Sequence, residues 1–538
     1  MDTNELQRIR AAAADNDTAP EPKHQCGGMG TRLQAHGFQD IIYRGWGTAQ
    51  RPAVSRSRFA DDAIRRRDAI AALLPGERLV IPAGIPKTRV NDIDFQPFRI
   101  GTAFAYLTGL GKGYKADSVL VIDPIVTEDG VVGHHDVLYV EPPIDRSDPR
   151  FYSDYKHGEF WTGPQPTLAD FAVMTGIETR DRTELEDALR ADAGPDGVRL
   201  RLCRDVDALV DALVDQVRID CGLGGADENA GLDEVLQERL GEIRLIKSPV
   251  EIEEMRRSVR ATLRAFDRVA DMLPIARQVA RGERLLETVF TGSARYEGHV
   301  VAGIPAVASG VRSGVLHYED NSGSLKDGDL VLIDGGGELD SLYTADITRT
   351  FPVNGRFTPT QRRVYDAVVA SEMAGIEAAS RPCARYRDIQ DAVMASIAQS
   401  LHDMGILPVS VEEALGPDGQ QQCRWLYHGT GHMLGIDMHD GQHARNRYYP
   451  DAELKPGMIF TIEPGLYFDA DDLLIPEEYR GIGVRVEDDI LITDHGAEVL
   501  VDYPRTSDEI EQWLSEHNPQ RYLRSFLDHD SMAVDSDD

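Results

Sequence analysis

The sequence predicts an N-terminal α/β domain followed by a second domain of long helices and short apolar strands. Three observations carry this prediction. The chain has 538 residues, and at about 150 residues per domain this length allows about two to four domains. Strand-like and helix-like segments are mixed up to about residue 240. Beyond that point, long helices alternate with short apolar strands as far as about residue 505.

The N-terminal domain is expected to span residues 56–240, after a polar extension at residues 1–55. Apolar residues at helical spacing, with basic residues on the other face, predict a helix over 58–74. Pro75 and Gly76 end that helix. Apolar runs then predict strands at 78–82, 118–122 and 136–140, and helical patterns follow at 183–190 and 205–215.

The C-terminal domain is expected to span residues 241–505, and its first helix has a clear start. Ser248 is a typical N-cap residue, Pro249 suits the first turn, and Glu251 lies near the positive end of the helix dipole. Residues 506–538 form a C-terminal segment whose acidic end is expected to be a solvated tail. Further long helices are predicted at 360–380 and 387–404.

Composition narrows the possible functions. The chain has 57 Lys and Arg against 91 Asp and Glu, a formal net charge of −34, so neither nucleic acid nor an anionic membrane is an expected partner. No apolar run reaches about 18 residues, and the N-terminus lacks the apolar core of a secretory signal. The five scattered cysteines suggest neither a disulfide framework nor a thiolate zinc site. We therefore expect a cytoplasmic protein.

Four acidic residues differ from the surface acids because they lie inside or at the ends of apolar strands. They are Asp334, Asp346, Glu463 and Glu487. A single acid of this kind is most often a capped or salt-bridged structural residue, since a buried carboxylate must be paired or coordinated. Four of them in one predicted domain exceed what Arg349 and Arg485 can neutralise. Divalent cations would neutralise all four.

Residues 428–439 contain three of the 15 histidines, His428, His432 and His439. His428 and His432 share a face if this segment is a helical turn. A zinc protease of the HExxH type is not indicated, because no Glu follows His428. One imidazole with several carboxylates favours hard or borderline ions such as Mn²⁺. Four carboxylates exceed the needs of one ion, which favours a pair of ions.

Five segments resemble the metal-site blocks of the creatinase/prolidase family of "pita-bread" metallopeptidases, in the family's order. They are LVLIDGGG, YTADITRTFPVNG, HGTGHMLGIDMHD, FTIEPGLY and GVRVEDDILIT. Within the family, the chain is most similar to Xaa-Pro aminopeptidase (aminopeptidase P) and its relative prolidase. RFADDAIRRRDAIAALLPG and FRIGTAFAYLTGL are similar to the creatinase-type N-terminal domain. The resemblance implies a creatinase-like α/β domain followed by a pita-bread α+β catalytic domain.

The resemblance also implies a dinuclear metal site. Its ligands would be Asp334, Asp346, His432, Glu463 and Glu487. Asp346 and Glu487 would bridge two divalent ions, for which Mn²⁺ is the expected metal. Glu463 would in addition help to accept the proton of the bridging water.

Further residues match positions that act on the substrate. His317 matches an active-site histidine ahead of the first metal ligand, and His439 would steady the substrate and the oxyanion. His428 matches a histidine that lines the proline pocket. Arg485 matches an arginine that braces the metal site and is counted with the catalytic residues.

These roles predict an aminopeptidase that hydrolyses the N-terminal Xaa-Pro bond of peptides with proline at the second position. Proline lacks an amide N–H and has a fixed φ, so a strand-like grip on the substrate fails there, whereas a two-metal site does not need it. The alternative is a prolidase, which cuts only Xaa-Pro dipeptides with the same metal site. A non-catalytic pita-bread binding protein is disfavoured because all five ligand types are present. Relatives are commonly dimers or tetramers, so a homo-oligomer is expected.

Overall fold

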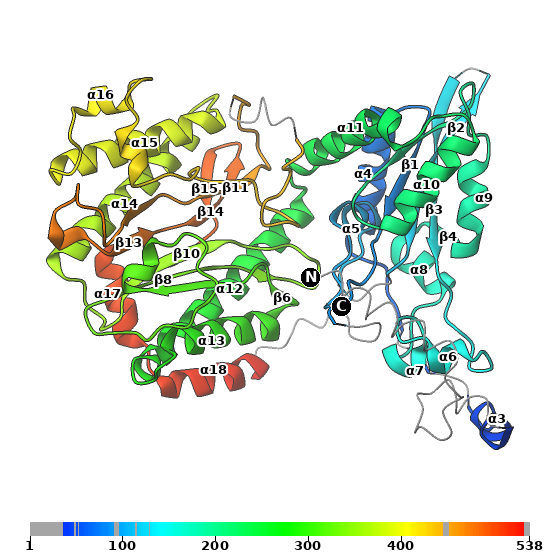
Figure 1. The fold of residues 1–538 in the computed structure, drawn as a ribbon, viewed down its shortest axis with the longest axis horizontal. Helices are drawn as coiled ribbons and strands as arrows, with labels where there is room; N and C mark the ends of the chain where they lie inside the picture. Colours follow the sequence, from blue (N-terminus) through cyan, green and yellow to red (C-terminus); the bar gives the residue numbers. More distant parts are fainter. Residues whose placement is uncertain are drawn as a thin grey trace, which may run out of the picture.

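The computed structural model describes residues 36–47, 50–51, 53–90, 96–112, 116–128, 130–444 and 451–531. Figure 1 shows an N-terminal part with one sheet and a larger C-terminal part, as the predicted α/β and α+β classes require. Most of the predicted extension at residues 1–55 lies outside the described residues, and a short helix, α3 (His36–Ile42), is described near its end. The proposed domain boundaries stay a prediction.

The N-terminal domain is built on one mixed sheet of five strands in the order β4-β3-β2-β1-β5. The central pairs β1–β2 and β2–β3 are antiparallel, and the outer pairs β3–β4 and β1–β5 are parallel. The three predicted strands fall on β1, β2 and β3. The strands are β1 (Glu77–Pro82), β2 (Val119–Thr127), β3 (Gly130–Val140), β4 (Glu178–Asp181) and β5 (Arg199–Leu202).

Helices cover both faces of this sheet because its strands are apolar on both sides. Val80 packs with α9 (Leu185–Arg190) and α10 (Ala208–Asp220) on one face. Its neighbour Leu79 points to the opposite face, as side chains in a strand alternate, and packs with α4 (Ala60–Leu73) and α5 (Thr102–Thr108). The remaining helices of this part are α6 (Arg150–Ser153), α7 (Glu159–Thr162), α8 (Leu168–Thr175) and α11 (Ala226–Arg244).

The C-terminal domain opens with the predicted helix start. Ser248 caps α12 (Pro249–Ala276), and the side chain of Glu251 accepts a hydrogen bond from the Ser248 amide at 2.9 Å. Figure 1 shows α12 and α13 (Gly282–Glu297) on one side of the strands, and α14 (Pro359–Ala379) and α15 (Tyr386–Asp403) on the other. The strands of the C-terminal domain are therefore enclosed between two helix pairs.

Three-stranded and two-stranded sheets form the centre of this domain. One has the order β10-β8-β7 and another the order β11-β14-β15, and an isolated bridge between Thr348 and Glu487 connects the two. β12 pairs with β13, and β6 with β9. The strands are β6 (Val300–Val301), β7 (Ala306–Ser309), β8 (Leu330–Gly335), β9 (Gly337–Glu338), β10 (Ile347–Pro352), β11 (Ile459–Ile462), β12 (Gly465–Phe468), β13 (Ile482–Arg485), β14 (Asp488–Thr493) and β15 (Gly496–Val499).

The last two described helices pack back onto this domain. The remaining helices are α16 (Val411–Leu415), α17 (Ser507–Glu516) and α18 (Pro519–Ser531). α18 contacts α12 and extends to Ser531, so it takes in the first residues of the predicted acidic tail, and the rest of that tail lies outside the described residues. Among the helices described, none is both long and apolar enough to cross a membrane.

The N-terminal domain contacts two segments of the C-terminal domain through Arg99 and Thr102. The Arg99 guanidinium donates to Glu338 at 2.6 Å and to the carbonyl of Ile436 at 2.7 Å. The hydroxyl of Thr102 donates to Asp437 at 2.6 Å. Glu338 follows the strand of Asp334, and Asp437 lies between His432 and His439, so the N-terminal domain fixes backbone next to the predicted metal site.

Candidate metal centre

The four predicted acids lie at strand ends of neighbouring sheets. Asp334 is in β8, and Asp346 directly precedes β10, which pairs with β8 in antiparallel register. Glu463 directly follows β11, and Glu487 lies between β13 and β14. The bridge between Thr348 and Glu487 brings the two sheets together, so acids more than a hundred positions apart converge.

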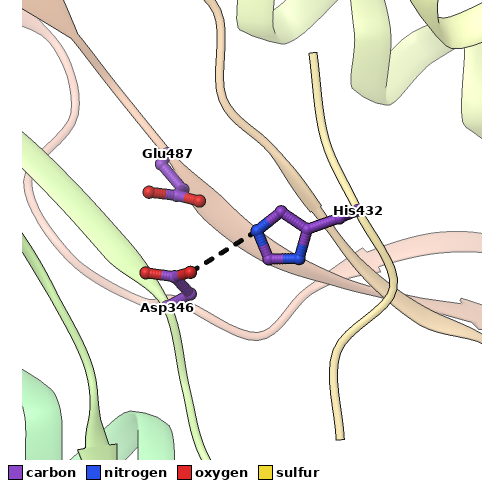
Figure 2. A group of neighbouring side chains, drawn as sticks. All are labelled: Asp346, His432 and Glu487. Atoms are coloured by element: carbon purple, nitrogen blue, oxygen red, sulfur yellow. Dashed lines mark ion pairs between the residues drawn. The ribbon is translucent and has the colours of Figure 1, made fainter. Parts of the chain in front are cut away.

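Asp346, His432 and Glu487 form the closest group at this junction. Each has one potential ligand atom within 4.8 Å of those of the other two. Figure 2 shows the three side chains pointing toward one another, and Nε2 of His432 lies 3.5 Å from Oδ2 of Asp346. His432 donates from Nδ1 to the carbonyl of Met433 at 3.2 Å, which turns Nε2 toward the carboxylates.

Glu463 and Asp334 border this group but are not part of it. Oε1 of Glu463 lies 3.5 Å from Nε2 of His432, and Asp334 makes an ion pair with Arg485. Arg349, the other arginine considered as a partner, pairs with Asp488 at 2.7 Å instead. Arginine therefore neutralises only one of the four predicted acids.

The residues present fit a divalent cation. Oδ1 of Asp346 is buried and has no hydrogen-bond partner, which is costly unless a cation occupies that position. Burial raises the pKa of Asp346, and burial together with Asp346 and Glu463 raises the pKa of Glu487. Oxygen donors with one imidazole suit Mn²⁺ or a similar ion better than a thiolate-preferring one.

Hydrogen bonds from the strands orient the group. The hydroxyl of Thr348 donates to Oε2 of Glu487 at 2.6 Å, and the amide of Glu487 donates to the carbonyl of Thr348 at 3.1 Å. Arg485 is buried and donates from Nε to the same hydroxyl at 3.1 Å and from Nη1 to Tyr467 at 3.0 Å. Arg485 thus contacts Asp334 directly and Glu487 through Thr348. The bracing role that the family resemblance implies for it stays a prediction.

Asp489 is a fifth acid at the site and is absent from the predicted set. It is fully buried, and its carboxylate accepts a long hydrogen bond of 3.3 Å from the amide of Asp346. Burial and the neighbouring Asp346 raise its pKa well above the usual range. Side chains alternate along a strand, so the reasoning that paired Arg485 with Glu487 would also have placed Asp489 on their face.

The histidine segment is not the helical turn that was considered for it. Residues 428–440 are extended or bent, because Met433 bridges to Phe460 and the amide of His432 donates to the hydroxyl of Thr461 at 3.1 Å. His428 and His432 nevertheless both approach Glu463, at 3.8 and 3.5 Å. Pairing with β11, rather than a helix, brings them to the same carboxylate.

The histidines differ in their readiness to take a proton. Burial opposes a charge on His432, but Asp346 and Glu463 raise its pKa to about 9. Burial lowers the pKa of His428 to about 4, and burial together with His432 lowers that of His439 to about 4. His439 stacks on His432 with ring centroids 4.0 Å apart. His439 and His428 are therefore neutral imidazoles near pH 7.

Glu463 and Tyr467 are further polar residues around the group of Asp346, His432 and Glu487. Burial raises the pKa of Glu463 to about 7, although His432 and Arg485 oppose that shift. His428 donates from Nδ1 to the carbonyl of Gly429 at 2.7 Å, so its Nε2 accepts from the hydroxyl of Tyr467 at 2.8 Å. Tyr467 was not among the predicted residues, although it lies in the quoted FTIEPGLY segment.

His317 is exposed and lies in the segment between β7 and β8. The segment that carries it packs against β13, the strand that ends at Arg485, because the amide of Gly483 donates to the hydroxyl of Ser313 at 3.0 Å. The structure therefore brings the segment of His317 to the region of the other predicted site residues.

Two family models match the chain in the expected order. Residues 63–197 match the N-terminal domain of aminopeptidase P, and residues 253–494 match metallopeptidase family M24. The chain is 42% identical over 473 residues to Xaa-Pro aminopeptidase 1 of Streptomyces coelicolor, covering 88% of this chain and 90% of that protein. It is 33% identical over 430 residues to human Xaa-Pro aminopeptidase 3, covering 79% and 78%.

Solved structures agree with these similarities. Proline aminopeptidase P II from Yersinia pestis superposes with a TM-score of 0.72 at 29% identity, covering 85% of this chain and all of that one. A zinc-substituted Escherichia coli aminopeptidase P in complex with product superposes with a TM-score of 0.71 at 29% identity, covering 85% and 98%. The likeness extends over both domains.

Proposed function

Because the chain belongs to metallopeptidase family M24 and is a metal-dependent aminopeptidase, we propose that it removes the first residue from peptides with proline at the second position. The proposal includes two divalent ions, with Mn²⁺ as the physiological metal. It also includes a cytoplasmic location and a dimeric or tetrameric assembly, which size measurement of the purified protein in solution would test.

The observation that carries this proposal is the group of Asp346, His432 and Glu487 with its unpaired carboxylate oxygen. Asp334 and Glu463 flank this group, so the five residues would hold the ions between the two sheets. When bound, divalent cations polarise a scissile carbonyl and lower the pKa of a bound water to about 7. Two divalent ions would also balance the negative charge of the carboxylates that no arginine pairs with.

The chain's own residues would handle the protons. The carboxyl group of Glu463, with a pKa of about 7 in the metal-free protein, is suited to take up a proton near neutral pH. The neutral imidazole of His439 can donate an N–H to an oxygen on which negative charge develops. His317 lies on the same side and would share this role with His439.

The substrate's proline would lie against His428. This imidazole is held by Gly429 and Tyr467, so it presents a fixed apolar face and cannot gain charge near pH 7. A proline residue has no amide N–H that could pair with a strand, so it cannot bind well to a sheet edge. The fixed imidazole ring of His428 offers a surface for van der Waals contact instead. This placement would select proline at the second position.

The direct test is product analysis on three peptides. The purified protein should release the first residue from an Xaa-Pro-Xaa tripeptide and should leave the matched Xaa-Ala-Xaa tripeptide intact. Cleavage of Gly-Pro but not of the tripeptide would identify a prolidase instead. No cleavage of any Xaa-Pro peptide with metal present would refute the proposal.

A separate experiment tests the proposed requirement for two divalent ions and the preference for Mn²⁺. Chelation should abolish turnover, and adding back Mn²⁺ should restore it further than adding Zn²⁺ or Mg²⁺. Metal analysis of the restored protein should give about two ions per chain. Turnover that persists after complete metal removal would contradict this part of the proposal.

A further inference from the structure

His317 is carried by a segment with little regular structure of its own. The segment leaves β7 at Ser309, forms a short 3₁₀ helix, and reaches β8 without another helix or strand. His317 itself is exposed. Its position next to β13 and Arg485 therefore depends on the contacts that hold the segment in place.

One buried carboxylate gathers these contacts. Glu283 is the second residue of α13 and is completely buried. Its Oε1 accepts from the amide and hydroxyl of Ser309 at 2.8 and 2.7 Å and from Nε of Arg312 at 2.7 Å. Its Oε2 accepts from the hydroxyl of Tyr318 at 3.1 Å and from the amide of Gly323 at 2.6 Å.

These five donors come from both ends and from the middle of the segment. Ser309 is its first residue, Tyr318 is the direct neighbour of His317, and Gly323 is near its end. The amide of Glu283 donates back to the carbonyl of Gly323 at 3.1 Å, so hydrogen bonds run in both directions between α13 and this segment. A single side chain therefore contacts several distant parts of this loop.

The close packing around Glu283 also restricts which residue fits at position 323. A Cβ atom at Gly323 would lie 2.6 Å from Oε2 of Glu283 and 2.2 Å from Nη2 of Arg312, so glycine is required for this close approach. Arg312 supplies the charge that compensates the buried carboxylate. Asn321 adds a second anchor by accepting from Val307 at 2.8 Å and donating to Pro305 at 2.8 Å.

We propose that Glu283 is a positioning residue that holds His317 in place against the substrate, acting through Ser309, Tyr318 and Gly323. The inference rests on the proposed function, because it assigns His317 to the substrate side of the site. All five donors lie in the segment of His317, so loss of the carboxylate would displace this histidine and leave the metal ligands in place.

A double-mutant cycle with His317 tests the inference on the metal-loaded enzyme. Glu283→Gln should lower kcat/KM for an Xaa-Pro-Xaa peptide by about 10- to 100-fold, the usual cost of misplacing a reacting group by about 1 Å. In a His317→Ala background, the same substitution should cost less than about 3-fold. Metal content should stay at the wild-type level. Equal losses in both backgrounds, or loss of metal, would overturn the proposal.

A matched control and a milder variant complete the experiment. Glu287→Gln makes the same charge change one turn further along α13, where the residue pairs with Arg284 at 3.5 Å, and should leave kcat/KM unchanged. Tyr318→Phe removes one of the five hydrogen bonds and should fold even if Glu283→Gln does not. It should cost about 2- to 10-fold, and nothing in the His317→Ala background. A loss that persists in that background would refute the proposal.

A crystal structure of Glu283→Gln separates this inference from the proposed function. If the wild-type enzyme cleaves no Xaa-Pro peptide, the function fails, but the structure still reports whether His317 has moved from its position in the wild-type protein. A His317 that keeps its place without the carboxylate would refute the positioning role by itself.

Discussion

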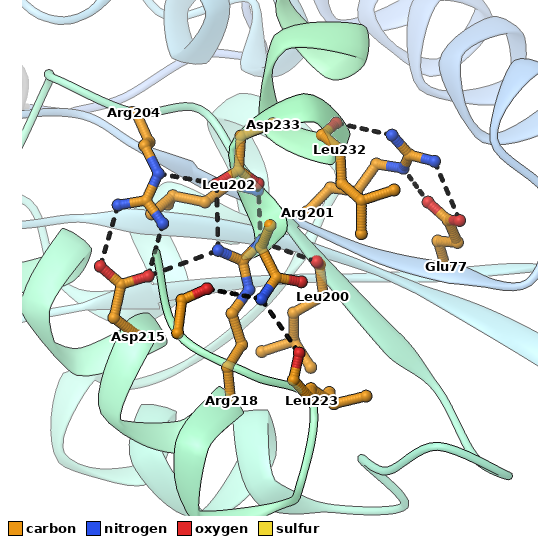
Figure 3. A network of polar contacts seen from close by, with 12 residues as sticks. Glu77, Leu200, Arg201, Leu202, Arg204, Asp215, Arg218, Leu223, Leu232 and Asp233 are labelled. Carbon is orange, nitrogen blue, oxygen red and sulfur yellow. Dashed lines mark hydrogen bonds and ion pairs between the residues drawn. The ribbon is translucent and has the colours of Figure 1, made fainter. Parts of the chain in front are cut away.

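Two clusters of partly or fully buried charged side chains, one in each domain, differ in charge balance. The paired cluster in the N-terminal domain consists of Arg204, Asp215, Arg218 and Asp233 (Figure 3). The carboxylate cluster in the C-terminal domain consists of Asp334, Asp346, Glu463 and Glu487. In the first, two guanidiniums face two carboxylates. In the second, four carboxylates face the single guanidinium of Arg485 and the imidazole of His432.

The hydrogen bonds of the two clusters differ in the same way. Asp233 accepts from Arg218 at 2.6 and 3.0 Å, from Arg204 at 2.7 Å and from the amide of Leu202 at 2.8 Å, so both of its oxygens are used. One oxygen of Asp346 is buried without a partner. Burial of acids by itself therefore does not indicate a functional site. The indication comes from acids that the protein leaves unneutralised.

The largest expected difference between the clusters is in catalysis. Asp346→Asn keeps the size of the side chain but removes an anionic ligand, and should lower kcat/KM by more than about 1,000-fold because the metal supplies several kcal/mol. Asp233→Asn, the same change in the paired cluster, should leave kcat/KM of the folded enzyme within about 2-fold. Peptide hydrolysis and metal analysis on both variants measure this. Wild-type turnover by Asp346→Asn would show that the ligand is misassigned.

The reverse difference is expected in stability. Asp233→Asn leaves the buried guanidinium of Arg218 with one carboxylate, Asp215, at the longer distance of 3.4 Å, and should lower the free energy of unfolding by about 3–5 kcal/mol. Asp346→Asn removes the ion pair with His432 but also removes a like-charged neighbour of Glu487, so it should destabilise the metal-free protein less than Asp233→Asn does. Urea unfolding followed by circular dichroism compares the two variants. A metal-free Asp346→Asn protein less stable than Asp233→Asn would contradict this interpretation.

The two clusters should also differ in pH dependence. In the metal-free protein, the pKa of Glu463 is raised to about 7 and that of His432 to about 9, so both groups bind protons more tightly in the folded state. Stability should then be highest below about pH 5 and should fall as the pH rises through 7 to 9, by on the order of 3 kcal/mol. Guanidiniums stay charged throughout this range, so the paired cluster should contribute no such slope.

Unfolding of the chelated protein at pH 5, 7 and 9 measures this slope. Metal binding requires the unprotonated ligands, so saturation with Mn²⁺ should remove the decline or reverse it. A metal-free protein whose stability rises between pH 5 and 9 would show that the carboxylates are not held in the protonated form.

The smallest expected effect belongs to a neighbouring ion pair that is more exposed than the pair of Arg218 and Asp233. Arg201 donates to Glu77 at 3.0 Å, and the side chain of Glu77 is 20% exposed (Figure 3). Glu77→Gln should cost less than about 1 kcal/mol of stability, because solvent screens the pair and compensates its loss. A cost as large as that of Asp233→Asn would mean that burial does not separate these two pairs.

Local signals in the sequence were reliable where neighbouring residues interact with each other. The start of α12 was predicted from Ser248, Pro249 and Glu251, and the structure confirms the cap because all of its contacts lie within one turn. The acids at the ends of apolar strands were found in the same way. The helical turn considered for His428 and His432 does not form, since a spacing of four fits a helix but pairing with β11 holds this segment extended.

Contacts between segments that are distant in the sequence could not be predicted from such local signals. Asp489 shares a strand face with Glu487 and could have been found by alternation. The partnership of Glu283 with the segment of His317, and that of Arg99 with Glu338, join residues 26 to 239 positions apart. No periodicity links residues at such distances, because the intervening chain can follow many paths.

The sequence by itself determined the order of the two domains and the acids at the ends of apolar strands, because propensity, capping and alternation act within a few residues. Only the tertiary structure decided which charges meet. It paired Asp334 with Arg485 and Arg349 with Asp488, and left Asp346 facing His432 and Glu487. Electrostatic energy depends on distance in space and on burial, and both are set by how the sheets pack rather than by position along the chain.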